Sequence, residues 1–224
     1  MIATDEPADA GTRIADRRRM IAAGIVAAAG AIVGGRTSPA AATTPPTTPP
    51  ATGGGSEPSA SAPAESAPPT TAPGRPTAAD VELLRPLQSA ELAAKELYRA
   101  AGADDPVLGA LAESHQAYAD VLAALLGGSS ERDDTLYEER LGDFESSDVA
   151  AVSSAGYELE SALVSTHADV LGQLEAIDGA TTLASILIVE SRHCAVLADL
   201  SGRGDDLDAL LINRSPALTT ATGV

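Results

Sequence analysis

Hydrophobic residues recur every three to four positions through most of the chain after residue 77, which is the spacing of amphipathic helices. This pattern predicts four long helices, over residues 77–101, 106–126, 147–177 and 181–200. No stretch alternates hydrophobic and polar residues in the sustained way that a half-buried strand does. The sequence therefore predicts an all-α fold.

Local signals mark the ends of these helices. Thr77-Ala78-Ala79-Asp80 is a capping box, and Asp105-Pro106 combines a capping side chain with the residue best suited to the first helical position. Gly127-Gly128 and Asp178-Gly179 are expected to end the second and third helices. Within the third helix, Ser153-Ser154-Ala155-Gly156 is expected to be a soft point, because serine and glycine are weak helix formers.

The connections between the helices predict their topology. The turns after the first and third helices are short, so each of these helices forms an antiparallel hairpin with the next one. Residues 129–146 are polar, with a short helix expected around Tyr137 to Leu141, and this segment is long enough to cross a bundle about 30 Å in length. We thus expect a four-helix bundle over residues 77–202, followed over residues 203–224 by a short helix and a frayed tail.

The first 42 residues have the organisation of an export signal. Arg17-Arg18-Arg19 precedes an apolar run from Met20 to Gly35, and Ala40-Ala41-Ala42 has the small residues that a signal peptidase accepts. Asp16 to Ile21 resembles the twin-arginine export motif. The apolar run is short for a stable membrane span, which needs roughly 20 apolar residues. Residues 1–42 therefore predict an extracytoplasmic protein, and an uncleaved signal would tether it to the membrane.

The next segment and the charge distribution separate this leader from the bundle. Residues 43–76 are rich in Thr, Pro, Ala and Ser and are predicted to be a disordered linker, because they hold too little apolar surface to form a core. Residues 1–77 hold six acidic and six basic side chains, so the net charge of −18 falls on residues 78–224. Such an acidic domain repels nucleic acid, which we exclude as a partner, and it suits cations.

Composition also limits the chemistry. The single Cys194 excludes an intrachain disulfide and a cysteine-rich metal cluster. Aromatic residues make up only 2% of the chain, so the core must consist mainly of Ala, Leu, Val and Ile in closely packed helices. No nucleophilic triad or phosphate-binding loop is visible in the sequence.

Several polar side chains interrupt the predicted inward faces. Glu190 and His193 lie one helical turn apart in the run Ile186 to Gly202, at positions where the pattern calls for Leu or Ala. Glu91 and Glu160 lie on the inner stripes of the first and third helices. Unpaired burial would cost several kcal/mol for each group, so these side chains must find partners or a metal ion.

The residues Tyr157-Glu158-Leu159-Glu160 and Ile186-Leu187-Ile188-Val189-Glu190-Ser191-Arg192-His193, with the inward Glu91, resemble the ferritin-like superfamily. They are similar in particular to exported bacterial ferritin-like domain proteins, whose fourth helix carries an apolar run followed by Glu-x-Arg-His. The superfamily's di-iron site takes one Glu from each of two helices and a Glu-x-x-His from each of the other two. The resemblance covers roughly residues 80–202.

Carried over residue by residue, the resemblance implies Glu91, Glu160, Glu190 and His193 as metal ligands. The second helix departs from the pattern, because Gln116-Ala117-Tyr118-Ala119 stands where Glu-x-x-His is expected. One half-site thus remains, formed by Glu160, Glu190 and His193, with Glu91 as a fourth ligand across the bundle. His115, one residue before Gln116, is a candidate replacement nitrogen.

The histidines also have a simpler interpretation. All three histidines of the chain fall on inner stripes, and His115 and His167 taken singly are more simply explained as core residues bonded to other side chains. A metal-free network would then pair Glu160 with His167 or His193.

Two functions follow from these alternatives. The first is an exported ferritin-like protein that binds one Fe or Mn ion in a reduced site and has a redox or metal-binding role. The second is a metal-free bundle that acts as a structural or interaction module outside the cytoplasm, with a second copy of the chain or another protein as its partner. A storage shell is not expected, because the domain follows a long leader.

Overall fold

The computed structural model describes residues 72–102 and 105–219. These residues form helices and no strand, as the sequence predicted. The predicted export signal of residues 1–42 lies outside the described residues, as does all but the end of the predicted linker.

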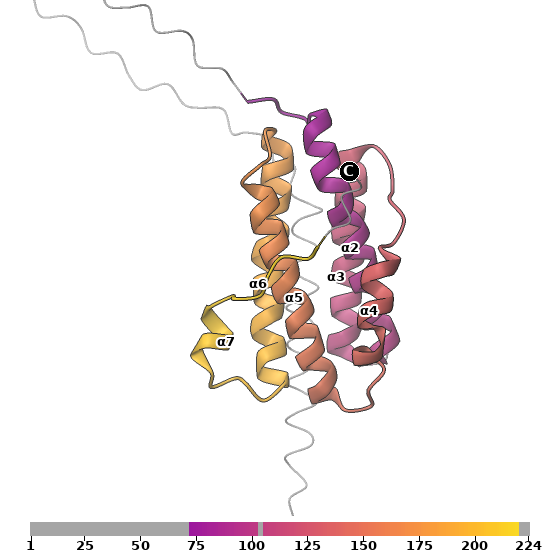
Figure 1. Cartoon of the computed structure of the whole chain (residues 1–224), viewed down its shortest axis with the longest axis vertical. Helices are drawn as coiled ribbons and strands as arrows, with labels where there is room; N and C mark the ends of the chain where they lie inside the picture. The colour runs from indigo at the N-terminus through magenta and orange to yellow at the C-terminus, as the bar shows by residue number, and fades with distance from the viewer. Residues whose placement is uncertain (1–71, 103–104, 220–224) are drawn as a thin grey trace, which may run out of the picture. The chain divides into compact units, whose positions relative to one another are not determined.

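Four long helices and two short ones follow one another along the described part of the chain. Their bounds are α2 (Ala78–Gly102), α3 (Pro106–Leu126), α4 (Asp134–Phe144), α5 (Val149–Leu171), α6 (Ile177–Leu200) and α7 (Leu207–Leu211). The helices α2 and α3 pack as one antiparallel hairpin, and α5 and α6 pack as a second (Figure 1). The segment that contains α4 crosses from one end of the bundle to the other, so α3 and α5 run in the same direction. This is the predicted four-helix bundle with a crossover.

The predicted caps of the first two helices are confirmed. The Thr77 amide donates to the Asp80 carboxylate and the Asp80 amide to the Thr77 hydroxyl, at 2.9 and 3.2 Å, which is the reciprocal pairing of a capping box. The Asp105 carboxylate accepts hydrogen bonds from the first amides of α3. Gly127 ends α3 with φ of 71°, in the left-handed region that glycine adopts without strain.

The turn between α5 and α6 lies earlier than the sequence indicated. We expected the third helix to reach residue 177 and Asp178-Gly179 to end it, but α5 ends at Leu171 and both of these residues lie in the first turn of α6. The reason is a long-range contact. The buried Asp80 carboxylate, besides capping α2, accepts the backbone amides of Glu175 and Ala176 and so holds the turn in place.

The soft point expected at Ser153-Ser154-Ala155-Gly156 is not present, because α5 is continuous through these residues. Gly156 is instead a point of close approach between helices. A Cβ atom on Gly156 would lie 3.0 Å from the Tyr98 hydroxyl and 3.2 Å from the Leu197 Cδ2. Glycine therefore allows the ring of Tyr98 to pack directly against α5.

The bundle interior has two apolar clusters. One surrounds Tyr98 and Phe144 and includes leucines of α2, α3, α5 and α6. The other joins Leu84, Leu122 and Ile186 with their apolar neighbours. Because the helices run through both clusters, the residues between them on each helix are enclosed at both ends by apolar side chains.

The end of the chain is more ordered than expected. The Leu218 amide donates to the Thr166 hydroxyl at 2.8 Å, and the Ser165 hydroxyl donates to the Ser215 carbonyl at 2.7 Å. The predicted frayed tail is therefore attached to α5 as far as Leu218. Of the helices in the described residues, none is long and apolar enough to cross a membrane.

Candidate metal centre

Six fully buried ionisable side chains occupy the middle of the bundle, between the two apolar clusters. Each of the four long helices contributes at least one of them. They are Glu91 from α2, His115 from α3, Glu160 and His167 from α5, and Glu190 and His193 from α6. We call this group the buried cluster.

Helical spacing explains why these side chains meet. Glu190 and His193 are three residues apart and share one face of α6, whereas Glu160 and His167 are seven residues apart and share one face of α5. On each helix, apolar residues before and after these side chains pack into the core and so turn this face toward the interior of the bundle. The polar residues consequently come together at one level of the bundle.

Glu160 lies at the centre of one side of the cluster. Its Oε1 accepts a hydrogen bond from the Tyr98 hydroxyl at 2.9 Å and lies 2.9 Å from the Nε2 of His115. The Nδ1 of His193 lies 3.3 Å from the same oxygen. Three helices besides α5 therefore converge on this carboxylate.

His115 and His167 form the contacts on the other side. The Nδ1 of His115 lies 2.6 Å from Glu91 Oε2, and the Nδ1 of His167 lies 2.5 Å from Glu190 Oε2. The Nε2 of His167 also lies 3.2 Å from Glu91 Oε1, which is within ion-pair distance but without hydrogen-bond alignment. Every carboxylate of the cluster thus has at least one imidazole neighbour.

These pairings control the charges of the cluster. Burial raises the pKa of Glu91, but the hydrogen bond with His115 and the attraction of His115 and His167 outweigh it and lower the pKa to about 2. Burial lowers the pKa of His167, but the negative charges of Glu190 and Glu91 and the hydrogen bond with Glu190 raise it to about 10. The pKa of His115 is raised in the same way by Glu160 and Glu91. The imidazoles and carboxylates of the cluster therefore favour one another's charged forms.

The two remaining carboxylates differ. Burial raises the pKa of Glu160, but the attraction of His115 and His193 and the hydrogen bond with His115 outweigh it and lower the pKa. The pKa of Glu190 is raised, first by burial and then by the negative charges of Glu91 and Glu160, although His167 opposes the shift. A cation in the cluster would relieve this repulsion.

Hydrogen bonds do not satisfy all the polar atoms of the buried cluster. Glu91 Oε1, Glu160 Oε2 and Glu190 Oε1 have no hydrogen-bond partner, nor does either ring nitrogen of His193. Each such buried atom costs about 1–3 kcal/mol. Carboxylate oxygens and an imidazole nitrogen with open lone pairs are the donor set that Fe(II), Mn(II) and Zn(II) accept. The chemistry of these side chains therefore fits a metal ion.

Two combinations of ligand atoms lie close enough to hold an ion. The first consists of His115, Glu160 and His193, and the second of Glu91, His115 and Glu190. Within each combination the ligand atoms lie within 4.8 Å of one another. His115 belongs to both, because its Nε2 faces Glu160 and its Nδ1 faces Glu91. The structure thus brings all five predicted ligands into the cluster.

The structure corrects the position of the altered motif on the second helix. Gln116 lies outside the cluster, where its side chain hydrogen bonds to Lys95 and Asp120. The residues of α3 that reach the cluster are His115 and Tyr118, which are three residues apart; the ring of Tyr118 stacks near that of His193, with centroids 6.2 Å apart. His115 and Tyr118 therefore stand where the resemblance implies Glu and His, one residue earlier than we expected.

Sequence reasoning did not assign a site role to His167 or Tyr98. His167 was interpreted as an ordinary core histidine, but it contacts two carboxylates of the cluster. Tyr98 donates a hydrogen bond to Glu160 from α2. The available signal was spacing, because each residue lies two helical turns after a predicted ligand, Glu160 and Glu91 respectively.

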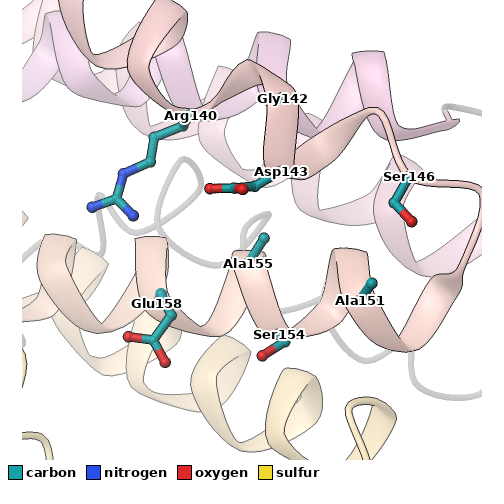
Figure 2. Close-up of a pocket in the computed structure, with 8 residues that line it drawn as sticks. All are labelled: Arg140, Gly142, Asp143, Ser146, Ala151, Ser154, Ala155 and Glu158. Atoms are coloured by element: carbon teal, nitrogen blue, oxygen red, sulfur yellow. The ribbon is translucent and has the colours of Figure 1, made fainter.

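An open pocket lies on the surface between α4 and α5, separate from the cluster (Figure 2). Figure 2 shows Arg140 and Asp143 on one wall and Glu158 on the other. None of the six cluster residues lines this pocket. Its side chains are those of a solvated surface, and we assign it no function.

Comparison with protein families agrees with this geometry. A family model described as a ferritin-like domain matches residues 80–203, which is more than half of the chain. The chain belongs to the ferritin-like domain family. No curated protein and no solved structure matched the chain. The matched range begins at Asp80 and contains all of α3 to α6, so it includes the six residues of the buried cluster.

Family membership gives meaning to the departure on α3. A ferritin-like centre with Glu-x-x-His on two helices has a near two-fold arrangement of ligands. Here α6 keeps Glu190-x-x-His193, whereas α3 has His115-x-x-Tyr118. The number of carboxylates that face the centre is therefore three rather than four, and the two halves of the centre are unequal.

Proposed function

We propose that this ferritin-like protein binds a single Fe or Mn ion in the buried cluster and acts outside the cytoplasm in a redox or metal-binding role. The observation that carries the proposal is the set of buried atoms without hydrogen-bond partners, which lie on Glu160, Glu190 and His193 and also on Glu91. A metal ion satisfies such oxygens and nitrogens together, which a purely apolar environment cannot do.

The ligands would come from several helices. Glu160, His193 and the Nε2 of His115 would hold the ion on one side, and Glu190 Oε1 is available one turn before His193. A bound Fe or Mn ion would supply one-electron redox chemistry. The protein's own part is to hold these side chains at fixed depth and to exclude water, because all of them are fully buried.

Outer contacts would orient the ligands. Metal-ligating histidines usually donate their other N–H to a carboxylate. Glu91 Oε2 is so placed for His115, at 2.6 Å from its Nδ1. The Tyr98 hydroxyl similarly fixes the Glu160 carboxylate through a 2.9 Å bond. These contacts support a preformed site.

The first test is the metal content and thermal stability of the purified full chain. Expression in iron-rich and in manganese-rich medium should give about one ion per chain. A ligand that binds the folded state alone at about 1,000 times its Kd adds about 4 kcal/mol of stability, so a strong chelator should lower the thermal midpoint by roughly 10 °C. Metal-free protein from both media, with a midpoint unaffected by chelator, would refute the proposal.

Variants locate the ion. His193→Ala should lose the ion, whereas Glu158→Gln should retain it. Glu158 is a matched control because it lies on the same helix as Glu160 but is exposed, with only a 3.7 Å contact to Arg203. Loss of the ion in both variants would show that binding does not depend on the buried cluster.

The alternative function is a metal-free structural or interaction module. The observation that favours it is that His115 and His167 pair directly with the cluster's carboxylates. Under this alternative, the variants that disturb the cluster alter stability but no metal is recovered. The chelator experiment therefore distinguishes the two functions.

Export is a separate part of the proposal. It is supported by Arg17-Arg18 and the apolar run that follows them in the sequence. Replacing both arginines by lysine should leave the protein in the cytoplasm if the twin-arginine route is used. Unchanged export of this double variant would refute that route. Whether the leader is retained as a membrane tether is tested by the mass of the exported chain.

A further inference from the structure

The ring of His167 lies between two carboxylates of the buried cluster. Its Nδ1 is 2.5 Å from Glu190 Oε2, and its Nε2 is 3.2 Å from Glu91 Oε1. These carboxylates come from different hairpins, α5–α6 and α2–α3. His167 therefore bridges them across the bundle, as a metal ion shared by two carboxylates would.

The position of this bridge coincides with one of the two possible ion sites. Glu91 and Glu190, with His115, form the second combination of close ligand atoms. His167 contacts both of its carboxylates. The first combination is different, because among the described residues His167 makes no hydrogen bond or ion pair with His115, Glu160 or His193. Buried atoms without hydrogen-bond partners occur in both combinations, namely Glu160 Oε2 and both ring nitrogens of His193 in the first, and Glu91 Oε1 and Glu190 Oε1 in the second.

We propose that the imidazole ring of His167 occupies the place of a second metal ion, so that the centre holds one ion only, on the side of His115, Glu160 and His193. This inference rests on the proposed metal-binding function and specifies the site that would be used. It makes His167 a positioning residue, since it would act through Glu91 and Glu190 rather than touch the ion.

Steric and bonding arguments support the assignment. An ion on the Glu91 side would have to lie between the two carboxylates that the His167 ring now contacts, and this fully buried ring could not rotate away without repacking. The Nδ1 of His115 is also engaged with Glu91 on this side. Its Nε2 is directed at the first combination, 2.9 Å from Glu160 Oε1.

The test is to remove the ring and count the metal ions. The full chain, stripped of metal and then loaded anaerobically with Mn(II), should bind one ion per chain as measured by native mass spectrometry. His167→Ala frees Glu91 and Glu190 and should bind two. Two Mn(II) ions a few ångströms apart should also give the exchange-coupled electron paramagnetic resonance signal that wild-type protein lacks.

A matched variant controls for general loosening of the centre. Tyr98 lies seven residues after Glu91, as His167 lies seven after Glu160, and each bonds or contacts the carboxylate of the other hairpin. Tyr98→Phe removes the hydroxyl that orients Glu160, so it should bind Mn(II) more weakly than wild type but should take up no more than one ion per chain. Two ions in Tyr98→Phe would show that any disturbance of the centre admits a second ion, which would overturn the specific role of His167.

The remaining outcomes are also decisive. Two ions in the wild type, or one ion in a folded His167→Ala, would overturn the inference while leaving metal binding established. No ion in either protein would instead refute the proposed function. Circular dichroism before loading shows whether His167→Ala is folded. If it is not, the test uses the ion count of wild type and of His167→Phe, which keeps a ring without nitrogens. Both proteins should then bind one ion per chain. A second ion in His167→Phe would count against the ring as the obstacle.

Discussion

The two hairpins of the bundle place equivalent positions around one centre but occupy them with different residues. Glu91 of α2 and Glu160 of α5 each have, seven residues later, a side chain that reaches the carboxylate of the other hairpin. On α2 that side chain is Tyr98, which offers a single hydroxyl. On α5 it is His167, whose two nitrogens engage both Glu91 and Glu190. One side is therefore bridged by an imidazole between two carboxylates, and the other is not.

The second helices of the hairpins show the same inequality. Glu190 and His193 on α6 correspond in spacing to His115 and Tyr118 on α3. The substitution on α3 replaces a carboxylate by an imidazole with a nitrogen on either side. A near-symmetric fold can therefore support an asymmetric centre, and under the proposed function these few substitutions would decide which side receives an ion.

The largest expected effect is the loss of metal affinity when Glu160 is replaced, compared with the same replacement at Glu91. Glu160→Gln removes the charge on which Tyr98, His115 and His193 converge, so we expect metal affinity to fall more than 100-fold and the metal-free protein to lose about 3 kcal/mol of stability. Titration with Mn(II) and denaturant unfolding measure the two effects.

Glu91→Gln is the matched variant on the bridged side. It should be destabilised to a similar extent, because His115 and His167 lose their anionic partner, but its metal affinity should fall only about 10- to 100-fold, as is typical for a residue that orients a ligand. Equal losses of affinity in the two variants would contradict the unequal roles of the two sides.

A smaller effect tests whether packing against Gly156 holds Tyr98 in its hydrogen bond to Glu160. Gly156→Ala places a methyl group 3.0 Å from the Tyr98 hydroxyl, and the ring cannot easily yield because it is fully buried against Phe144. Overpacking should exceed the helix-propensity gain of alanine, for a net loss of about 1–2 kcal/mol.

Gly142→Ala in α4 is the control for that substitution. No atom lies within 4 Å of the position of its added methyl group, so it should stabilise the protein by about 0.5–1 kcal/mol. Thermal and denaturant unfolding measure both changes. A stabilised Gly156→Ala would show that Tyr98 has room to move and that its bond to Glu160 is not enforced by packing.

The smallest effect concerns the link between the hairpins outside the centre. Burial raises the pKa of Asp80, but hydrogen bonds from Glu175, Thr77 and Ala176 lower it below its ordinary value of 3.8. A carboxylate with a lowered folded-state pKa stabilises the fold above its unfolded pKa, and this stability disappears as the pH falls through the folded value. Asp80→Asn should therefore cost about 1 kcal/mol at pH 7 and progressively less below pH about 4.

Urea unfolding of wild type and Asp80→Asn at pH 7 and at pH 3 measures this change. A difference between the two proteins that stays constant, or grows, at the lower pH would show that the charge of Asp80 does not contribute. The comparison requires no metal, so it can be made on stripped protein.

The helices and the ligand-bearing faces could be predicted from the sequence because both depend on local periodicity and capping. Thr77, Asp105 and Gly127 mark helix ends through contacts within a few residues. The α5–α6 turn could not be placed in this way, since it depends on Asp80, 95 residues away from Glu175. Local propensity carries no information about such a partner.

The centre was predictable in its members but not in its pairings. Glu190 and His193 were recognisable from spacing, as were the inward positions of His115 and His167. Which imidazole contacts which carboxylate depends on how far the four helices are shifted along their axes relative to one another. On α3 the sequence placed Gln116 at the ligand position, one residue too late, whereas in the structure Gln116 points away from the centre and bonds Lys95 and Asp120. A pattern on one helix does not fix that offset.

The most direct test of the unequal centre uses the fact that the chain has three histidines. Nitrogen-15 spectra of the imidazoles can be recorded on the full chain before and after addition of one equivalent of diamagnetic Zn(II). The signals of each ring are assigned from the variant that lacks that histidine. We predict that His115 and His193 each acquire a metal-bound nitrogen while neither nitrogen of His167 does. A metal-bound nitrogen on His167, or unchanged spectra for all three rings, would contradict the account.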